Sequence, residues 1–130
     1  MNDAGLPEVI VVGASAGGVA ALQAIVQALP AGLSVPVLVV LHVPRDRNSR
    51  IVEVLAPHCA VPVREAEDKQ PIERGTVTFA PPDYHLLVED RSSVALSIDP
   101  PVLYSRPAID PLFESCLLYT SDAADDSLRV

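Results

Sequence analysis

The chain has 130 residues, 49% of them hydrophobic, which is enough for one domain with a core and too short for two ordinary domains. Its formal net charge of −8 argues against nucleic acid or an anionic membrane surface as the main partner. No apolar run is long enough to cross a bilayer, and the first residues lack the basic start and apolar stretch of a signal peptide. We therefore expect a cytoplasmic protein without direct membrane insertion.

The first half of the chain alternates between short β-branched runs and stretches with helical spacing of apolar residues. These segments are, in order, a strand at 8–13, a helix at 18–29, a strand at 36–42, a helix at 50–58 and a strand at 61–66. Pro30 and Gly32 end the first helix, and Asn48 or Ser49 is expected to cap the second. The order predicts an α/β fold with a doubly wound, mostly parallel sheet covered by helices in three layers.

The second half changes character. Residues 76–82, 84–90 and 93–99 are short alternating segments separated by Pro, Asp and Ser, which predicts antiparallel hairpins. Residues 106–115 (RPAIDPLFES) resemble the start of a helix with Pro107 near its first turn.

The last fifteen residues, 116–130, fit none of these patterns. The first eleven of them, CLLYTSDAADD, match the translation of a transposase-type sequencing adapter codon for codon. We therefore expect residues 116–130 to be a non-native tail and residues 1–115 to be a partial domain. The alternative is a genuine acidic C-terminal tail. The two cysteines, Cys59 and Cys116, are too few and too unpatterned for a disulfide framework or a metal site.

The glycine-rich turn at residues 13–18 (GASAGG) allows two interpretations. A strand, a glycine turn and a helix N-terminus together can hold a nucleotide phosphate. The dinucleotide fingerprint, however, requires a glycine where Ser15 stands and an acidic residue where His42 ends the second strand. A P-loop is excluded because no G-K-S/T follows.

The same two departures favour a serine nucleophile. Residues 13–17 fit G-x-S-x-G, in which small neighbours let a strand-to-helix turn present the serine hydroxyl. The helix N-terminus offers N–H donors for an oxyanion, and histidine is the usual base for serine. Ser15 and His42 end the first two predicted strands, so a parallel sheet would bring them to one edge. A histidine 27 residues after the serine does not fit the order of the α/β-hydrolases, so another serine-hydrolase family is required.

Four ordered motifs across residues 8–115 resemble the catalytic domain of the chemotaxis protein-glutamate methylesterases, the CheB family. VVGASAGGVAAL resembles the nucleophile turn of the family, and VVLHVP resembles its histidine strand. VREAEDKQPIERGTVTFAPPDYHL resembles its E-A-x-D-G-x-x-I-x-P-G-x-V-Y-x-A-P-x-x-x-H-L segment, and RPAIDPLFES resembles R-P-S-V-D-x-L-F-x-S.

The resemblance implies hydrolysis of glutamate methyl esters, often with deamidation of glutamines, on the cytoplasmic helices of chemoreceptors. By position it implies Ser15 as nucleophile and His42 as general base and acid, with the backbone of Ala16 and Gly17 as oxyanion donors and no metal or cofactor. It places Arg106 near the active-site rim, where it either contacts substrate or pairs with Asp110.

The sequence also departs from the family. The aspartate of the family triad lies in a later L-T-G-M-G-x-D-G segment, and this sequence contains no such segment. Asp110 belongs to the R-P-x-x-D motif and is not its counterpart. Because the aspartate orients and stabilises the histidine, we expect the 130-residue chain as written to be inactive and poorly stable. The alternatives are a dinucleotide-binding Rossmann-type module and a non-catalytic scaffold domain.

Overall fold

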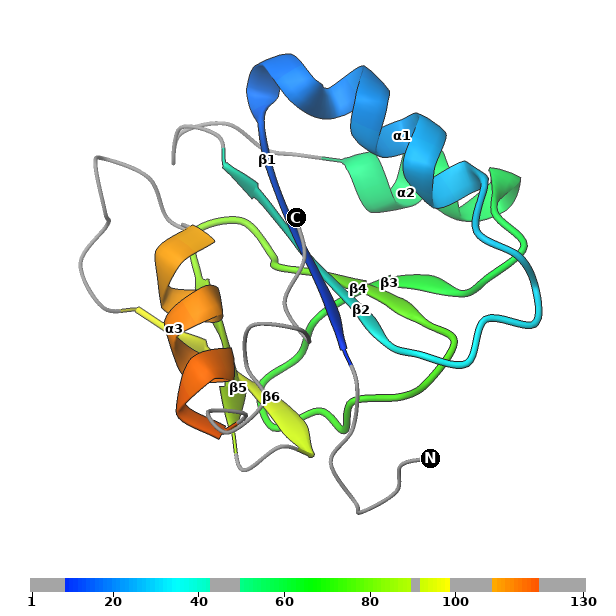
Figure 1. Cartoon of the computed structure of the whole chain (residues 1–130). Coiled ribbons are helices and arrows are strands. Elements are labelled where there is room, and N and C mark those ends of the chain that lie inside the picture. The colour runs from blue at the N-terminus through cyan, green and yellow to red at the C-terminus, as the bar shows by residue number, and fades with distance from the viewer. Residues whose placement is uncertain (1–8, 43–49, 90–91, 99–108, 120–130) are drawn as a thin grey trace.

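A computed structural model describes residues 9–42, 50–89, 92–98 and 109–119 (Figure 1). Within these ranges, only the backbone is described for residues 16, 42, 109, 110 and 117–119. The strands are β1 Ile10–Ser15, β2 Val37–His42, β3 Val63–Glu65, β4 Val77–Phe79, β5 His85–Glu89 and β6 Ser93–Ser97. The helices are η1 Ala16–Gly18, α1 Val19–Gln27, α2 Ile51–Leu55, η2 Ala56–His58 and α3 Ile109–Tyr119, where η marks a 3-10 turn.

Four strands form a parallel sheet in the order β1-β2-β4-β3, and β5 and β6 form a separate antiparallel pair. Strands β1 and β2 pair over six residues each, from Ile10 opposite Val37 to Ser15 opposite His42. This arrangement confirms the predicted α/β fold with a mostly parallel sheet and a hairpin.

The placement of β4 corrects the sequence-based expectation for residues 76–82. They were expected to form an antiparallel hairpin, but β4 lies between β2 and β3 and pairs in parallel with both. Val77, Thr78 and Phe79 are all buried, because β4 is covered on both faces as an interior strand. Thr78 lies between two apolar residues, which gave the segment the alternating pattern of a half-exposed strand. In the fold Thr78 is buried, and its hydroxyl accepts the Nε–H of Arg64 at 3.1 Å.

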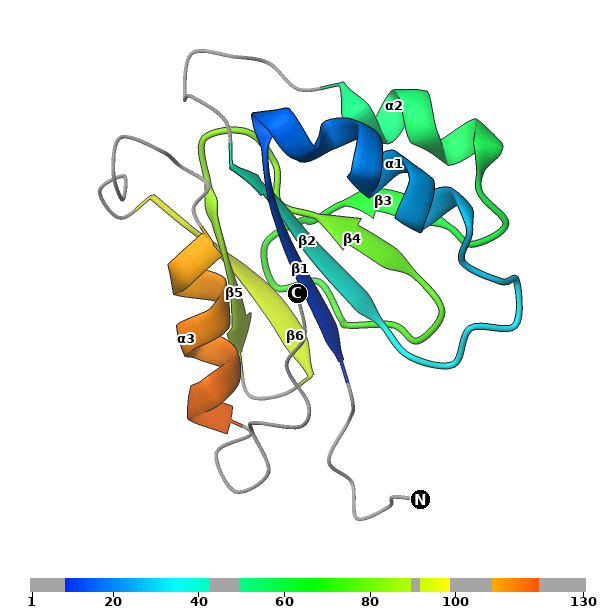
Figure 2. The ribbon, with the colours of Figure 1, turned by 45° about the horizontal axis from the view of Figure 1, so that its top comes forward.

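Helices α1 and α2 cover one face of the sheet, and the β5–β6 hairpin with α3 covers the other (Figures 1 and 2). On the first face, Leu22 and Val26 of α1 pack in one cluster with Val39 of β2 and Phe79 of β4. The apolar residues that recur at helical spacing in the sequence therefore form the face that α1 buries against the sheet. Ile25 belongs to the same periodic set but is 54% exposed, because it lies toward the edge of that face.

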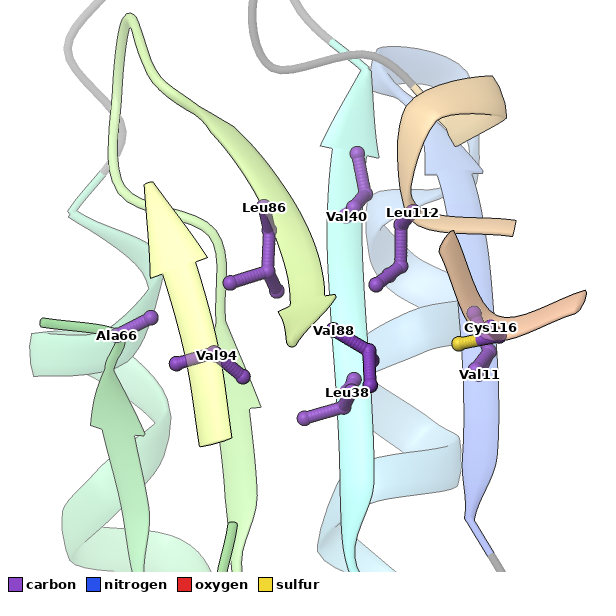
Figure 3. Packing of buried hydrophobic residues seen from close by; sticks show 9 residues of the cluster. All are labelled: Val11, Leu38, Val40, Ala66, Leu86, Val88, Val94, Leu112 and Cys116. Carbon is purple, nitrogen blue, oxygen red and sulfur yellow. The ribbon is translucent and has the colours of Figure 1, made fainter. Parts of the chain in front are cut away.

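On the second face, β1 and β2 pack against α3 and the hairpin (Figure 3). The cluster is made of buried side chains, namely Val11, Leu38, Val40, Ala66, Leu86, Val88, Val94, Leu112 and Cys116. Strand β2 is buried on both faces, and β1 packs against both clusters although only Val11 of it is buried. Packing on both faces explains why both strands are continuous apolar runs.

Helix α2 is shorter than the expected helix at 50–58. Pro57 has no N–H to donate within an α-helix, and the chain passes into the 3-10 turn η2 at Ala56. Arg50 takes the N-cap position with no side-chain capping bond, and the expected caps Asn48 and Ser49 lie outside the described residues. None of the helices in the described ranges is both long and apolar enough to cross a membrane.

Helix α3 confirms a helix in the RPAIDPLFES segment, although Pro107 lies outside the described residues and Pro111 occupies the first turn. Ser115 joins α3 to the hairpin: its hydroxyl accepts the N–H of Val88 at 2.9 Å and donates to the carbonyl of Leu112 at 2.7 Å. The helix continues past Ser115, and Cys116 is only 1% exposed. The expected boundary at residue 116 stays a prediction.

Candidate active site

Ser15 and His42 are the last residues of two neighbouring parallel strands. They are register partners in the β1–β2 ladder, so their backbones lie about 4.8 Å apart at the carboxyl edge of the sheet. This edge is where ligands bind in open α/β sheets. The structure therefore brings the two backbone positions together as the sequence predicts. The side chain of His42 lies outside the described atoms, and the catalytic roles of both residues stay predictions.

The hydroxyl of Ser15 is not used by the helix that follows it. Serine at an N-cap usually accepts an N–H from the first helical turn. Ser15 holds the N-cap position of η1, yet it makes no side-chain capping bond and is exposed. Its backbone, at φ −93° and ψ 172°, is ordinary extended chain, so the turn presents the hydroxyl without backbone strain. An exposed serine that does not cap its helix is suited to react with a ligand.

Backbone N–H groups gather directly after Ser15. Residues 16–18 form η1 and lead without a break into α1, so the first N–H groups of this helical segment have no partner within it. A Cβ atom added at Gly17 would meet nothing within 4 Å. The fold itself therefore does not require a glycine there, and the space beside its backbone is open to a ligand. This geometry supports the expected oxyanion donors, Ala16 and Gly17, whose role stays a prediction.

Three other potentially reactive side chains, one histidine and two cysteines, are at least partly buried. His85 is 2% exposed at the start of β5, so it is an interior side chain. Burial raises the pKa of the Cys59 thiol and raises the pKa of Cys116 to about 11. A raised pKa leaves less of each thiol as the reactive thiolate at neutral pH.

Some expected features are not placed by the structure. Arg106 lies outside the described residues, and so does the side chain of Asp110. The described side chains include no group of three or more His, Cys, Asp or Glu residues that could hold a metal ion. Residues 80–84 connect β4 to β5, whereas the sequence analysis had expected residues 76–82 and 84–90 to be segments of antiparallel hairpins.

A model of the family described as CheB methylesterase matches residues 10–124 of this chain. The chain belongs to the CheB methylesterase family. A putative protein-glutamate methylesterase/protein-glutamine glutaminase of Leptospira interrogans is 38% identical over 121 residues, covering 93% of this chain and 61% of that protein. The corresponding protein of Symbiobacterium thermophilum is 42% identical over 108 residues, covering 83% of this chain and 30% of its own length.

The CheB fold is also seen in a solved structure. The catalytic domain of the Thermotoga maritima CheB methylesterase aligns with a TM-score of 0.80 and 26% sequence identity, covering 94% of this chain and 64% of that one. The chain thus spans less than two thirds of the length of these CheB relatives. The family match favours the esterase interpretation of the glycine-rich turn over the dinucleotide-binding one.

Proposed function

We propose that the protein is a serine hydrolase of bacterial chemotaxis that demethylates glutamate methyl esters on chemoreceptors. The main support is that Ser15 and His42 are backbone register partners at the carboxyl edge of the sheet, in a chain of the CheB family. The relatives are also named protein-glutamine glutaminases. Because a glutamine amide can react with Ser15 through the same acyl-enzyme, we extend the proposal to glutamine deamidation.

In the first step, the Ser15 hydroxyl attacks the ester carbonyl while His42 takes its proton. The carbonyl oxygen becomes an oxyanion beside the N–H groups of Ala16 and Gly17, where the positive end of the α1 dipole also stabilises negative charge. The tetrahedral intermediate collapses, His42 returns the proton to the departing oxygen, and methanol leaves. The product is a glutamyl ester of Ser15.

In the second step, water attacks this acyl-enzyme. His42 removes a proton from the water and returns one to the Ser15 oxygen, which releases the glutamate carboxylate. No step requires a metal or a redox group. For a glutamine substrate the leaving group is ammonia, which must also receive its proton from His42.

We further propose that the partner is a methylated helix in the cytoplasmic part of a chemoreceptor, and that the protein acts in the cytoplasm. The net charge of −8 is in keeping with a protein partner and not with nucleic acid.

The test is covalent labelling of the natural full-length protein with a fluorophosphonate, which reacts with activated serine hydroxyls. We expect labelling of Ser15 that Ser15→Ala abolishes. Ser34→Ala provides the matched control, because Ser34 is also exposed but lies on the connection between α1 and β2. Equal labelling of wild type and Ser15→Ala would contradict the proposal. Thermal stabilisation by NAD(P) or FAD, with no labelling of Ser15, would favour a dinucleotide-binding module instead.

The 130-residue chain itself is expected not to hydrolyse esters, because it carries no L-T-G-M-G-x-D-G segment to supply a triad aspartate. The natural reading frame beyond Ser115 decides this point. A glycine-flanked aspartate after an apolar strand is the expected result. Ester hydrolysis by the purified 130-residue chain at the rate of the full-length protein would overturn the expectation.

A further inference from the structure

We draw no further inference here: the strongest candidate, the N-terminal end of α3 near the carboxyl edge of β1 and β2 (Figure 3), is a helix N-terminus by itself, and no second feature of the described residues points to a ligand there.

Discussion

Gly75 is the position at which the fold most clearly requires a glycine, and Gly75→Ala tests how β4 enters the sheet. Its φ of 73° lies in the left-handed region, which costs a residue with a Cβ roughly 1–2 kcal/mol. An added Cβ would also lie 2.8 Å from the carbonyl oxygen of Leu33, a backbone atom that must then shift. The N–H of Gly75 donates to Val35 at 3.0 Å, and the N–H of Val37 donates to Thr76 at 2.9 Å.

Displacing this backbone weakens one or both of these hydrogen bonds, at about 1 kcal/mol each. The expected loss in the free energy of unfolding for Gly75→Ala is therefore about 2–4 kcal/mol. The assay is urea unfolding of the natural full-length protein, followed by far-ultraviolet circular dichroism, with the slope against urea compared between variants. Gly75→Asn provides a second measurement, because asparagine tolerates the left-handed region and retains only the steric part of the loss.

Gly17→Ala is the matched control for the same substitution. Gly17 does not have a positive φ, and an added Cβ meets nothing within 4 Å, so its free energy of unfolding should stay the same or rise by up to about 1 kcal/mol. Equal stability of the two alanine variants, within about 0.5 kcal/mol, would refute the argument that Gly75 is required at the entry to β4.

Four further predictions concern the site, the junction of α3 and the two cysteines. Gly17→Ala should lower kcat/KM for ester hydrolysis in the full-length protein without loss of stability, because its Cβ enters the space next to the oxyanion donors; an unchanged rate would contradict this. Ser115→Ala leaves the N–H of Val88 without its partner and should lower the free energy of unfolding by about 1–3 kcal/mol, measured by urea unfolding; no change would show that this bond is replaced by water. In the 130-residue chain, iodoacetamide should modify Cys59 faster than Cys116, and equal rates would show that Cys116 is not buried. Burial raises the pKa of the Cys116 thiol from its ordinary value of 9.0 to about 11. The stability that the buried, protonated thiol contributes is therefore complete below pH 9 and is lost as the pH rises through 11. Cys116→Ala should remove this part of the pH dependence.

The order of elements and the paired positions of Ser15 and His42 follow from the sequence. The first two strands are apolar runs with a polar residue, Ser15 or His42, at the carboxyl end. The helix between them has apolar side chains at helical spacing. A strand, helix and strand in that order form a right-handed parallel unit, which brings the ends of the two strands to one edge. The structure confirms this register, with residue 15 opposite residue 42.

The placement of β4 was decided only by the tertiary structure. Three residues, Val77, Thr78 and Phe79, carry too short a pattern to distinguish a hairpin strand from an interior parallel strand. What selects the interior position is non-local: β2 and β3 pair on its two edges, and Gly75 allows the close approach to Leu33 at its entry. The spacing of apolar side chains and the turn residues are local properties that a sequence displays. Which strands lie next to one another depends on packing between distant segments of the chain.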